Sequence, residues 1–383
     1  MTTPDGRVHV LLAGGGTGGH VFPALAVGEA LTGRGCAVSF AGRPAGFEAR
    51  VVPERGVPFH PVASRPLVGR GPAGKLLALA TLGTGAVGAA RMVRRLGVDA
   101  VLGTGGYASA PAVLGAVLAR RPVLLLEPNA KPGFANRKLA RWAAGAAVAF
   151  QETCRELPCP CRATGVPVRE AFFAVPDLEA APGGAPELLV LGGSQGALSV
   201  NLALPRALTG EGGLLARVPG LRVVHQTGSA HLEATRAAYE EAGVPGEAVR
   251  LVPFIDDVAG AMARARLVVS RAGALTVAEI AAAGRPAVLV PLTLAEGHQR
   301  ENARALERAG AARVVEAEPE APSRPELLAA VLAPTLAELL AAPEVLTRMG
   351  RAGRALARPG ATGEIAGWLV ALAGAAGPSE GAA

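Results

Sequence analysis

The chain has few aromatic side chains and very few lysines. Phenylalanine, tryptophan and tyrosine make up 3% of its 383 residues, and Lys75, Lys131 and Lys138 are its only lysines. The net charge of +7 therefore comes almost entirely from arginine. Because the arginines are scattered and not interleaved with aromatics, the sequence argues against a nucleic-acid-binding protein. The charge favours phosphates, pyrophosphates or an anionic membrane surface as partners.

Cysteine is also scarce, with four residues in the whole chain. Four are too few for a disulfide framework at this length. The cluster Cys154, Cys159 and Cys161 does not have a usual zinc spacing, and no histidine stands near it. We expect free thiols in a reducing compartment, and no metal site.

Long hydrophobic runs and a signal peptide are missing as well. The longest weakly polar stretch, Leu76–Ala90, is short and glycine-rich, and it lies between Lys75 and Arg91. We expect it not to span a bilayer. A soluble protein with at most a surface attachment to membrane is the expectation.

What the sequence does contain is an alternation of short apolar runs with alanine-rich helical segments. Such alternation is typical of a doubly wound α/β sheet with buried parallel strands. The expected strands are Val8–Ala13, Ala37–Phe40, Asp99–Gly103, Pro122–Leu126 and Ala146–Phe150, and the expected helices are Val21–Leu31, Lys75–Leu96 and Pro111–Arg120.

The alternation stops in the proline- and glycine-rich stretch Glu156–Glu187, which we interpret as a linker, and then starts again. Two Rossmann-like domains, 1–168 and 169–345, are therefore predicted, with a helical tail 346–383 packing back on the first. Two facing sheets of this kind predict one cleft between the domains, at the carboxyl ends of the strands. The second set of expected strands is Glu187–Gly193, Leu221–Gln226, Val249–Phe254, Arg266–Ser270 and Pro286–Pro291.

The first expected strand runs into the loop GGGTGGH, whose Gly14, Gly16 and Gly19 fit the pattern G-x-G-x-x-G. A dinucleotide fold would place an acidic residue at the end of the next strand, where this chain has Arg43. That weakens an NAD-binding interpretation, although NADP would tolerate the arginine. The N–H groups at a helix start suit any phosphate.

His20 closes this loop at the expected helix start. A neutral imidazole there could take a proton from a reacting hydroxyl. A helix cap or an anion contact is an equally good interpretation of the same residue, and the two stay open.

Two further segments suggest contacts to a nucleotide. The second glycine loop, Leu191–Ala197, adds the side-chain donors of Ser194 and Gln195 to backbone N–H groups, which favours a phosphate contact. In Ser270–Pro291, Glu279 stands one turn into an expected helix and could accept hydrogen bonds from ribose hydroxyls. The helix dipole alone would also favour a glutamate there, so spacing does not decide.

Taken together, the motifs resemble one family, the lipid II-forming N-acetylglucosaminyltransferases of peptidoglycan synthesis, known as the MurG family. The similarity runs in order from about Val8 to Val315. The segments that carry it are GGGTGGHVFPAL, GTGGYASAP, EPNAKPGFANRKLA, GGSQGA, FIDD, RAGALTVAEIAAAGRPAVLVP and GHQRENA.

The resemblance implies a GT-B fold and an inverting enzyme, and we expect no cofactor. Its C-terminal domain would bind UDP-N-acetylglucosamine (UDP-GlcNAc), and its N-terminal domain would bind undecaprenyl-diphospho-N-acetylmuramoyl-pentapeptide. The sugar would be transferred to the muramoyl 4-hydroxyl in cell-wall synthesis, on the cytoplasmic face of the membrane, with release of UDP.

The resemblance also assigns residues. Glu279 would hold the ribose, and Ile255, following Phe254, would meet the uracil. The first glycine loop, together with Tyr107, would face the acceptor diphosphate, with His20 as first candidate base and Glu127 as second. The UDP-GlcNAc contacts implied are Thr17, Gly18, Gly19, Asn129, Arg169, Ser194, Gln195, Phe254, Ile255, Ala274, Leu275, Thr276, Glu279 and Gln299, and those to the acceptor diphosphate are Gly15, Gly16, Thr17, His20 and Tyr107.

Some positions depart from the family pattern. The family's HEQN reads Leu126, Glu127, Pro128 and Asn129 here, its GNPVR has Val166, and its double glutamine begins with His298. The five aspartates form no D-x-D pair, so we expect the leaving diphosphate to be stabilised by N–H groups, helix dipoles and arginine without a built-in metal.

A membrane-facing patch is predicted at Leu76, Leu77 and Leu79, bordered by Arg70 and Lys75, because apolar side chains ringed by cations suit an anionic bilayer surface. A core helix with solvated basic ends fits the same residues.

Three other function classes remain as alternatives. These are a related sugar enzyme (a glycosyltransferase acting on a soluble natural product, or a UDP-GlcNAc epimerase), an NADP oxidoreductase, and a non-enzymatic membrane-surface protein. The last leaves Glu279 and Ser194 without a role.

Overall fold

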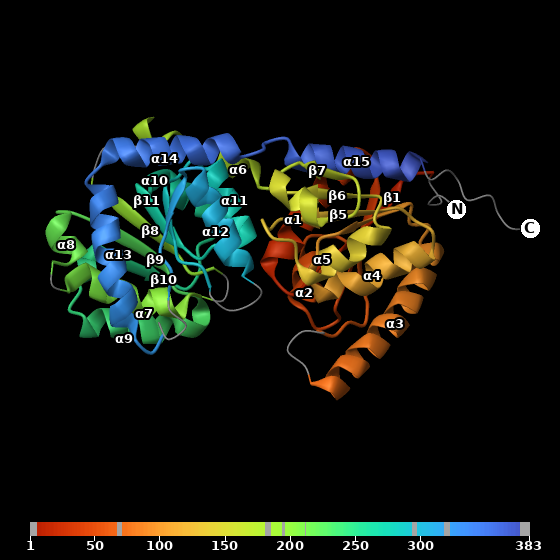
Figure 1. Cartoon of the computed structure of the whole chain (residues 1–383), viewed down its shortest axis with the longest axis horizontal. Helices are drawn as coiled ribbons and strands as arrows, with labels where there is room; N and C mark the ends of the chain where they lie inside the picture. Colours follow the sequence, from red (N-terminus) through yellow and green to blue (C-terminus); the bar gives the residue numbers. More distant parts are fainter. Residues whose placement is uncertain are drawn as a thin grey trace, which may run out of the picture. The chain divides into compact units, whose positions relative to one another are not determined.

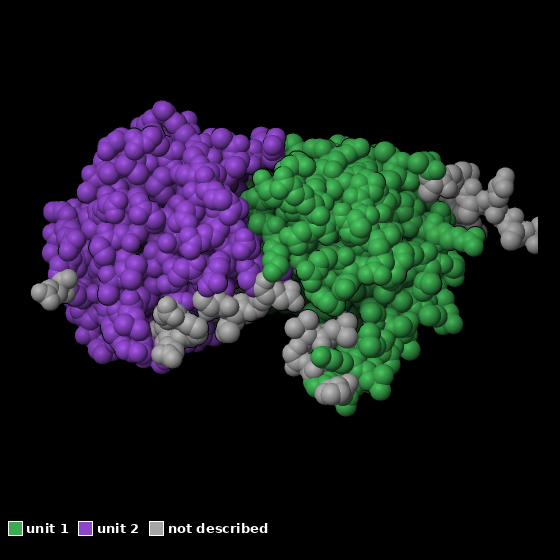
Figure 2. All heavy atoms as spheres, viewed as in Figure 1, with its two compact units in different colours: residues 1–168, 360–383 green, residues 169–359 purple. Residues whose placement is uncertain are grey.

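The computed structural model of the chain describes residues 6–66, 71–180, 185–193, 196–210, 212–292, 297–317 and 322–375 (Figure 1). The chain forms two compact units (Figure 2). Unit 1 comprises Met1–Val168 and Gly360–Ala383, and unit 2 comprises Arg169–Pro359. Each unit is described separately below.

Unit 1 is built on a seven-stranded parallel sheet in the order β3-β2-β1-β4-β5-β6-β7. The strand order reverses between β1 and β4, which is the point at which doubly wound sheets bind ligands. The strands are β1 (His9–Ala13), β2 (Ala37–Gly42), β3 (Phe59–Pro61), β4 (Ala100–Gly103), β5 (Val123–Glu127), β6 (Gly145–Val148) and β7 (Cys161–Ala163).

Helices cover both faces of this sheet, because alternate side chains of its strands are apolar on both sides. Val10 and Leu12 of β1 pack with α1, α2 and α15, whereas Leu11 and Ala13 pack with α3, α4 and α5. The helices are α1 (Gly18–Thr32), α2 (Phe47–Glu54), α3 (Pro72–Arg95), α4 (Gly106–Leu118), α5 (Phe134–Leu139) and α15 (Ala361–Ala375), with 3-10 turns η1 (Ala140–Trp142) and η2 (Gln151–Glu156).

Unit 2 repeats the design with six parallel strands in the order β10-β9-β8-β11-β12-β13. They are β8 (Glu187–Leu191), β9 (Arg222–Gln226), β10 (Val249–Val252), β11 (Leu267–Ser270), β12 (Ala287–Leu289) and β13 (Ala312–Val314). The helices are α6 (Glu170–Phe173), α7 (Leu198–Thr209), α8 (Leu214–Arg217), α9 (Leu232–Glu241), α10 (Val258–Arg264), α11 (Ala274–Ala282), α12 (His298–Arg308), α13 (Pro325–Leu340) and α14 (Pro343–Leu356), with 3-10 turns η3 (Leu178–Ala180), η4 (Ser229–His231) and η5 (Gly246–Ala248).

The predicted pair of doubly wound α/β folds is confirmed. Three strands were not expected, β3, β7 and β13, and each has only three residues. The stretch interpreted as a linker, Glu156–Glu187, contains β7, α6 and η3. Proline and glycine there mark short elements separated by turns.

The C-terminal tail is divided between the units. The expected tail began at residue 346, which lies inside α14, and α14 packs on α11 of unit 2. By contrast, α15 packs on α1 and β4 of unit 1, where Arg34 Nη2 donates to the Gly363 carbonyl at 2.9 Å. The indole of Trp368 lies over Gly145, where a Cβ would come within 2.3 Å of the ring.

The expectation of four free thiols is wrong for two of them. Cys154 and Cys161 form a disulfide that links η2 to β7, while Cys36 and Cys159 are free. The two cysteines lie on neighbouring short elements of one unit, a proximity that the seven-residue spacing did not reveal. Among the residues that the structure describes, no group of three potential metal ligands occurs.

Helix α3 (Pro72–Arg95) agrees with the expected helix Lys75–Leu96 to within three residues at each end. Taken singly, it is the one helix of the described ranges long and apolar enough, by length and composition alone, to cross a membrane. One of its faces packs along α4, with Ala89 and Ala90 against Gly115. Its N-terminal end projects from the body of unit 1 (Figure 1).

Candidate functional site

The loop between β1 and α1 leaves the start of a helix open. Gly16 has φ +86°, a conformation that residues with a Cβ rarely adopt. Thr17 is the N-cap of α1 and makes no side-chain cap bond, so the N–H groups of Gly18 and Gly19 point out of the helix start. Partial positive charge and free donors make this end of α1 suitable for a phosphate group.

Beneath the same loop lies Glu48, which the sequence reasoning missed. Its side chain is fully buried, and its Oε2 accepts the Gly16 N–H at 3.0 Å. Its Oε1 accepts the Arg43 N–H at 2.9 Å. The N–H of Gly16 is therefore used inside the protein, and the open donors of the loop begin after it.

His20 is the third residue of α1 and lies against the turn before α4. A Cβ at Gly105 would lie 3.5 Å from its Cε1, and a Cβ at Gly106 would lie 3.6 Å from its Nε2. Thr104 Oγ1 donates to the His20 carbonyl at 2.9 Å and joins β4 to the helix start. Tyr107 follows this turn, with its ring 5.9 Å from the Arg43 guanidinium carbon. The structure thus brings the candidate base next to the segment that carries Tyr107.

Glu127, the second candidate base, is buried at the end of β5. Its Oε1 accepts the backbone and side-chain N–H groups of Asn129, at 3.0 and 2.9 Å. Its Oε2 accepts the Gly133 N–H at 2.9 Å and Asn136 Nδ2 at 3.0 Å. Four donors occupy the lone-pair positions of the carboxylate, so the observed geometry makes Glu127 the organiser of the 127–136 loop.

The surroundings of His20 and the 127–136 loop are in contact. A Cβ at Gly105 would lie 3.1 Å from Asn136 Nδ2 and 3.5 Å from the His20 ring. Since Asn136 also bonds Glu127, the path from His20 to the Glu127–Asn129 loop passes through Gly105 and Asn136. The predicted residues of the first half therefore gather at the carboxyl ends of β1, β4 and β5.

In unit 2 the second glycine loop follows β8. Ser194 and Gln195 lie outside the described residues. The loop start is tied to β9, since the Gly192 N–H donates to the Gln226 carbonyl at 3.0 Å and Gln226 Nε2 donates to the Gly193 carbonyl at 3.3 Å.

A buried polar network behind this loop was also missed. His225 bonds Tyr239 Oη at 2.9 Å and Asn201 Oδ1 at 3.0 Å, and Asn201 Nδ2 donates to the Thr227 carbonyl at 2.9 Å. Burial lowers the pKa of His225 to about 3, so the ring is neutral. The available signal was the polar pair His225–Gln226 directly after the apolar residues Val223 and Val224 of the same strand.

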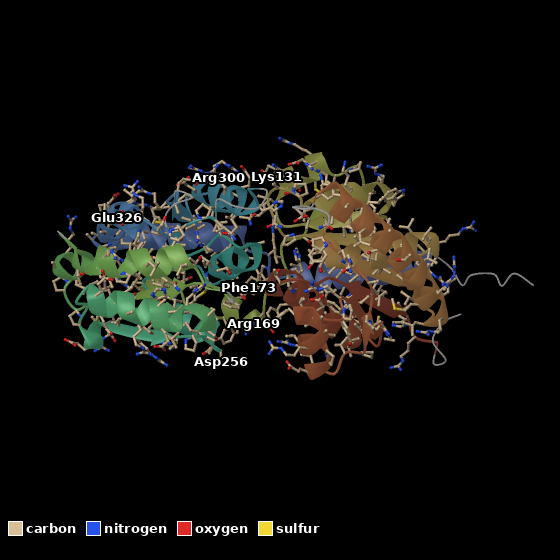
Figure 3. The ribbon with its side chains drawn as sticks, turned by 90° about the horizontal axis from the view of Figure 1, so that it is seen from below. Lys131, Arg169, Phe173, Asp256, Arg300 and Glu326 are labelled. Carbon is tan, nitrogen blue, oxygen red and sulfur yellow. A yellow bond between two sulfur atoms is a disulfide. The ribbon has the colours of Figure 1, made fainter. Side chains whose placement is uncertain are left out.

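The start of α11 carries the next group of predicted residues. Ala274, Leu275 and Thr276 form its first turn after Gly273, so their N–H groups are at the open end of the helix. Glu279 is partly buried one turn further, and burial raises the pKa of its carboxyl to about 7. The positive charge of Arg169 opposes part of that rise. Arg169 stands directly before α6, and Phe173 ends that helix (Figure 3).

Side-chain hydrogen bonds from Arg271, Gln299 and Asn302 tie together three helix starts of unit 2. Its Nη2 donates to Ser199 Oγ in α7 at 2.7 Å, and its Nη1 donates to the Val290 carbonyl at 3.2 Å. Gln299 in the first turn of α12 accepts the Leu292 N–H at 3.0 Å, and Asn302 Nδ2 donates to the Ala272 carbonyl at 3.1 Å. The N-terminal ends of α7, α11 and α12 are thus held at one edge of the sheet.

The segment after β10 places Phe254 and Ile255 differently. Phe254 is 57% exposed, while Ile255 is half-buried. Asp257 caps α10 by accepting the Gly260 N–H at 2.8 Å, which fixes the end of this segment.

Comparison with known families decides the classification. The glycosyltransferase family 28 N-terminal domain matches residues 10–148, and the family 28 C-terminal domain matches residues 187–353. The chain belongs to glycosyltransferase family 28. Its two units correspond to the two domains of that family.

Curated members of family 28 match almost the whole chain. A protein of Sorangium cellulosum, named UDP-N-acetylglucosamine–N-acetylmuramyl-(pentapeptide) pyrophosphoryl-undecaprenol N-acetylglucosamine transferase, is 44% identical over 96% of this chain and 89% of its own length. A protein of Halorhodospira halophila with the same name is also 44% identical, over 93% of this chain and 96% of its own length.

Among solved structures, MurG of Acinetobacter baumannii is 34% identical, with a TM-score of 0.77, and covers 95% of this chain and 100% of its own. This similarity agrees with the GT-B fold expected from the motifs.

Proposed function

We propose that this family 28 enzyme transfers N-acetylglucosamine from UDP-GlcNAc to the 4-hydroxyl of the muramoyl sugar of undecaprenyl-diphospho-N-acetylmuramoyl-pentapeptide. Its relatives of 44% identity carry the name of that activity over nearly their full length. The observation that carries the proposal is His20 at the open start of α1, beside the Gly105–Gly106 turn. A helix end suited to phosphate and a base belong together where the acceptor is a diphosphate-linked alcohol.

In this proposal unit 1 binds the acceptor. The N–H groups of Thr17, Gly18 and Gly19 meet its diphosphate, and Tyr107, which follows the Gly105–Gly106 turn beside His20, adds a further contact. Gly15 and Gly16 shape the loop, since the Gly16 N–H is already donated to Glu48. Glu127 holds Asn129 in place, and Asn129 meets the N-acetylglucosamine.

Unit 2 binds the donor in the same proposal. Ile255 meets the uracil beside Phe254, Glu279 accepts hydrogen bonds from the ribose, and the first turn of α11 meets the diphosphate. The positive charge of Arg169 lowers the pKa of Glu279, and this nearby cation supports the proposed binding of an anionic donor. Ser194 and Gln195 add phosphate contacts, and Gln299 adds a contact to the sugar.

The chemistry is a single in-line displacement. The acceptor 4-oxygen forms a bond to the anomeric carbon while the bond from that carbon to the UDP phosphate oxygen breaks. His20 takes the hydroxyl proton, and the electron pair of the broken bond leaves with UDP. The helix-end N–H groups of unit 2 stabilise the charge that develops on the diphosphate. One displacement inverts the configuration of the anomeric carbon.

The place of action proposed is the cytoplasmic surface of the membrane, because the acceptor is lipid-linked. Leu76, Leu77 and Leu79 are 71%, 50% and 53% exposed near the projecting end of α3, with Lys75 beside them. Arg70 lies outside the described residues. Exposed leucines next to a cation suit attachment to an anionic bilayer.

The variant His20→Ala tests the proposed base. We expect turnover to fall by about 100-fold or more, in the range of general-base catalysis, with unchanged affinity for UDP-GlcNAc. Transfer of labelled sugar to a lipid-linked acceptor gives the rate, and calorimetry gives the affinity.

His60→Ala is the matched control, because His60 lies in the same unit on the short strand β3 and should leave both values unchanged. Near-normal turnover of His20→Ala would refute the assignment of the base.

A further inference from the structure

Glu48 is a fully buried carboxylate under the glycine loop, yet it has no part in the chemistry described above. It sits in the first turn of α2, where the helix dipole favours negative charge. Burying a carboxylate is costly unless hydrogen bonds replace its hydration. Here the N–H groups of Gly16 and Arg43, at 3.0 and 2.9 Å, do so. The carboxylate therefore joins the first loop to the turn after β2.

The backbone around Glu48 is glycine at the positions where a Cβ would overlap its side chain. A Cβ at Gly15 would come within 2.2 Å of its Oε1, and one at Gly46 within 2.3 Å of the same atom. A Cβ at Gly42 would come within 2.5 Å of its Cγ. Glycines from two loops, the β1–α1 loop and the β2–α2 connection, thus form the pocket of a single side chain.

The bond from Gly16 has a consequence on the opposite side of the loop. The N–H and C=O of a trans peptide point in opposite directions. Because the Gly16 N–H points at Glu48, the Gly15 carbonyl points away from it. A Cβ at Gly106 would indeed lie 3.3 Å from that carbonyl oxygen and 3.6 Å from His20 Nε2. The hydrogen bond to Glu48 therefore orients the Gly15 carbonyl toward the His20 ring and the Gly106 turn.

We infer that Glu48 is a positioning residue of the acceptor site. It locks the Gly15–Gly16 peptide so that the Gly15 carbonyl lies at the Gly106 turn, and the open donors of α1 start at Thr17. It also places a negative charge under the Gly15–Gly16 corner, which repels phosphate from there and directs it toward the N–H groups of Gly18 and Gly19. The inference rests on the proposed role of this loop in binding the acceptor.

Two variants disturb this carboxylate in different ways. Glu48→Gln replaces one acceptor oxygen by an NH2 group, which faces a backbone N–H that it cannot accept. Gly46→Ala keeps the glutamate at position 48 but adds a methyl group at the position that its carboxylate occupies. The backbone at Gly46, φ −86° and ψ 168°, accommodates alanine without strain, so the carboxylate has to move.

Gly71→Ala is the matched control for Gly46→Ala. Gly71 is likewise the N-cap of a helix in unit 1, with φ −64° and ψ 174°, and its Cβ would meet no atom within 4 Å. Any loss caused by alanine at an N-cap is common to both variants. Glu54→Gln, at the exposed end of α2, controls for the loss of one charge.

The experiment measures kcat and KM for a water-soluble short-chain lipid I analogue, and the affinity for UDP-GlcNAc by calorimetry. We expect Glu48→Gln and Gly46→Ala each to lower kcat/KM for the acceptor by about 10- to 100-fold, as a displaced reacting geometry does, with donor affinity unchanged within about twofold. Gly71→Ala and Glu54→Gln should match the wild type.

A Gly46→Ala enzyme with normal acceptor kinetics would overturn the inference, and so would equal losses of donor and acceptor binding, which a purely structural role produces. If Glu48→Gln does not fold, Gly46→Ala decides alone. His20→Ala is run alongside. Normal turnover of His20→Ala refutes the proposed function of the loop. If His20→Ala loses turnover while Glu48→Gln and Gly46→Ala have normal kinetics, only the role of Glu48 is refuted.

Discussion

At the scale of single residues, three glutamates show how the same side chain takes different roles in different surroundings. Glu48 and Glu127 are buried carboxylates surrounded by N–H donors, and both hold loops in shape. Glu279 is partly buried, and burial raises the pKa of its carboxyl to about 7. We propose that only Glu279 receives its hydrogen bonds from a ligand.

The raised pKa of Glu279 predicts how donor binding depends on pH. The ionised carboxylate accepts bonds from ribose hydroxyls better than the protonated group does. Affinity for UDP-GlcNAc should therefore be greatest above about pH 7 and fall toward about tenfold per pH unit below it. The sugar nucleotide is the right probe, because its pyrophosphate diester does not titrate there.

Glu279→Gln should bind more weakly at pH 8 and lose this pH dependence, as measured by calorimetry between pH 5.5 and 8.5. Glu326→Gln, an exposed carboxylate at the start of α13 in the same unit, should retain the wild-type profile (Figure 3). An unchanged profile in Glu279→Gln would show that another group controls donor binding.

At the scale of elements, the sequence predicts the long buried strands well, because runs such as Val8–Ala13 are apolar on both faces of a covered sheet. It misses β3, β7 and β13, since each has three residues with a polar one in the middle, whereas the equally short β12 lies within the apolar run Pro286–Pro291. It also starts α1 too late, because Gly18 and Gly19 look like loop and are held in the helix by the tertiary setting.

Site residues divide in the same manner. His20 and Glu279 could be proposed from the sequence because each lies within a recognisable motif, GGGTGGH and RAGALTVAE respectively. Glu48 could not, since its role depends on the β1–α1 loop with Gly15 folding onto the β2–α2 connection that carries Gly42 and Gly46. The Cys154–Cys161 disulfide was missed for a similar reason.

Helix α3 gives the prediction that belongs to this scale. Replacing Leu76 and Leu79 by glutamate puts two negative charges on the exposed face of α3. We expect sedimentation with anionic vesicles to fall by about tenfold or more, because the binding free energy of two leucines that would enter the bilayer is lost and the added charges are repelled by the lipid headgroups. Turnover of a soluble short-chain acceptor should be unaffected.

The control pair is Leu327→Glu with Val331→Glu, which are 40% and 49% exposed on α13 of unit 2. This pair should leave vesicle binding as in the wild type. Equal sedimentation of both double variants would rule out the leucine patch as the attachment site.

At the scale of the whole molecule, two units that share the order of six strands, with a seventh strand in unit 1, carry different open helix ends. Unit 1 presents α1 with a histidine and a glycine loop shaped by a buried carboxylate. Unit 2 joins the starts of α7, α11 and α12 through Arg271, Gln299 and Asn302. We propose that unit 1 binds the reacting alcohol with its diphosphate and that unit 2 binds the sugar nucleotide.

The release of UDP from UDP-GlcNAc, measured with and without a lipid I analogue, tests the central claim most directly. We predict slow release from the donor alone, and rapid release with acceptor that equals the amount of N-acetylglucosaminyl product formed. Release of UDP at the same rate without acceptor, or epimerisation of the donor sugar with no acceptor consumed, would contradict the proposed transferase.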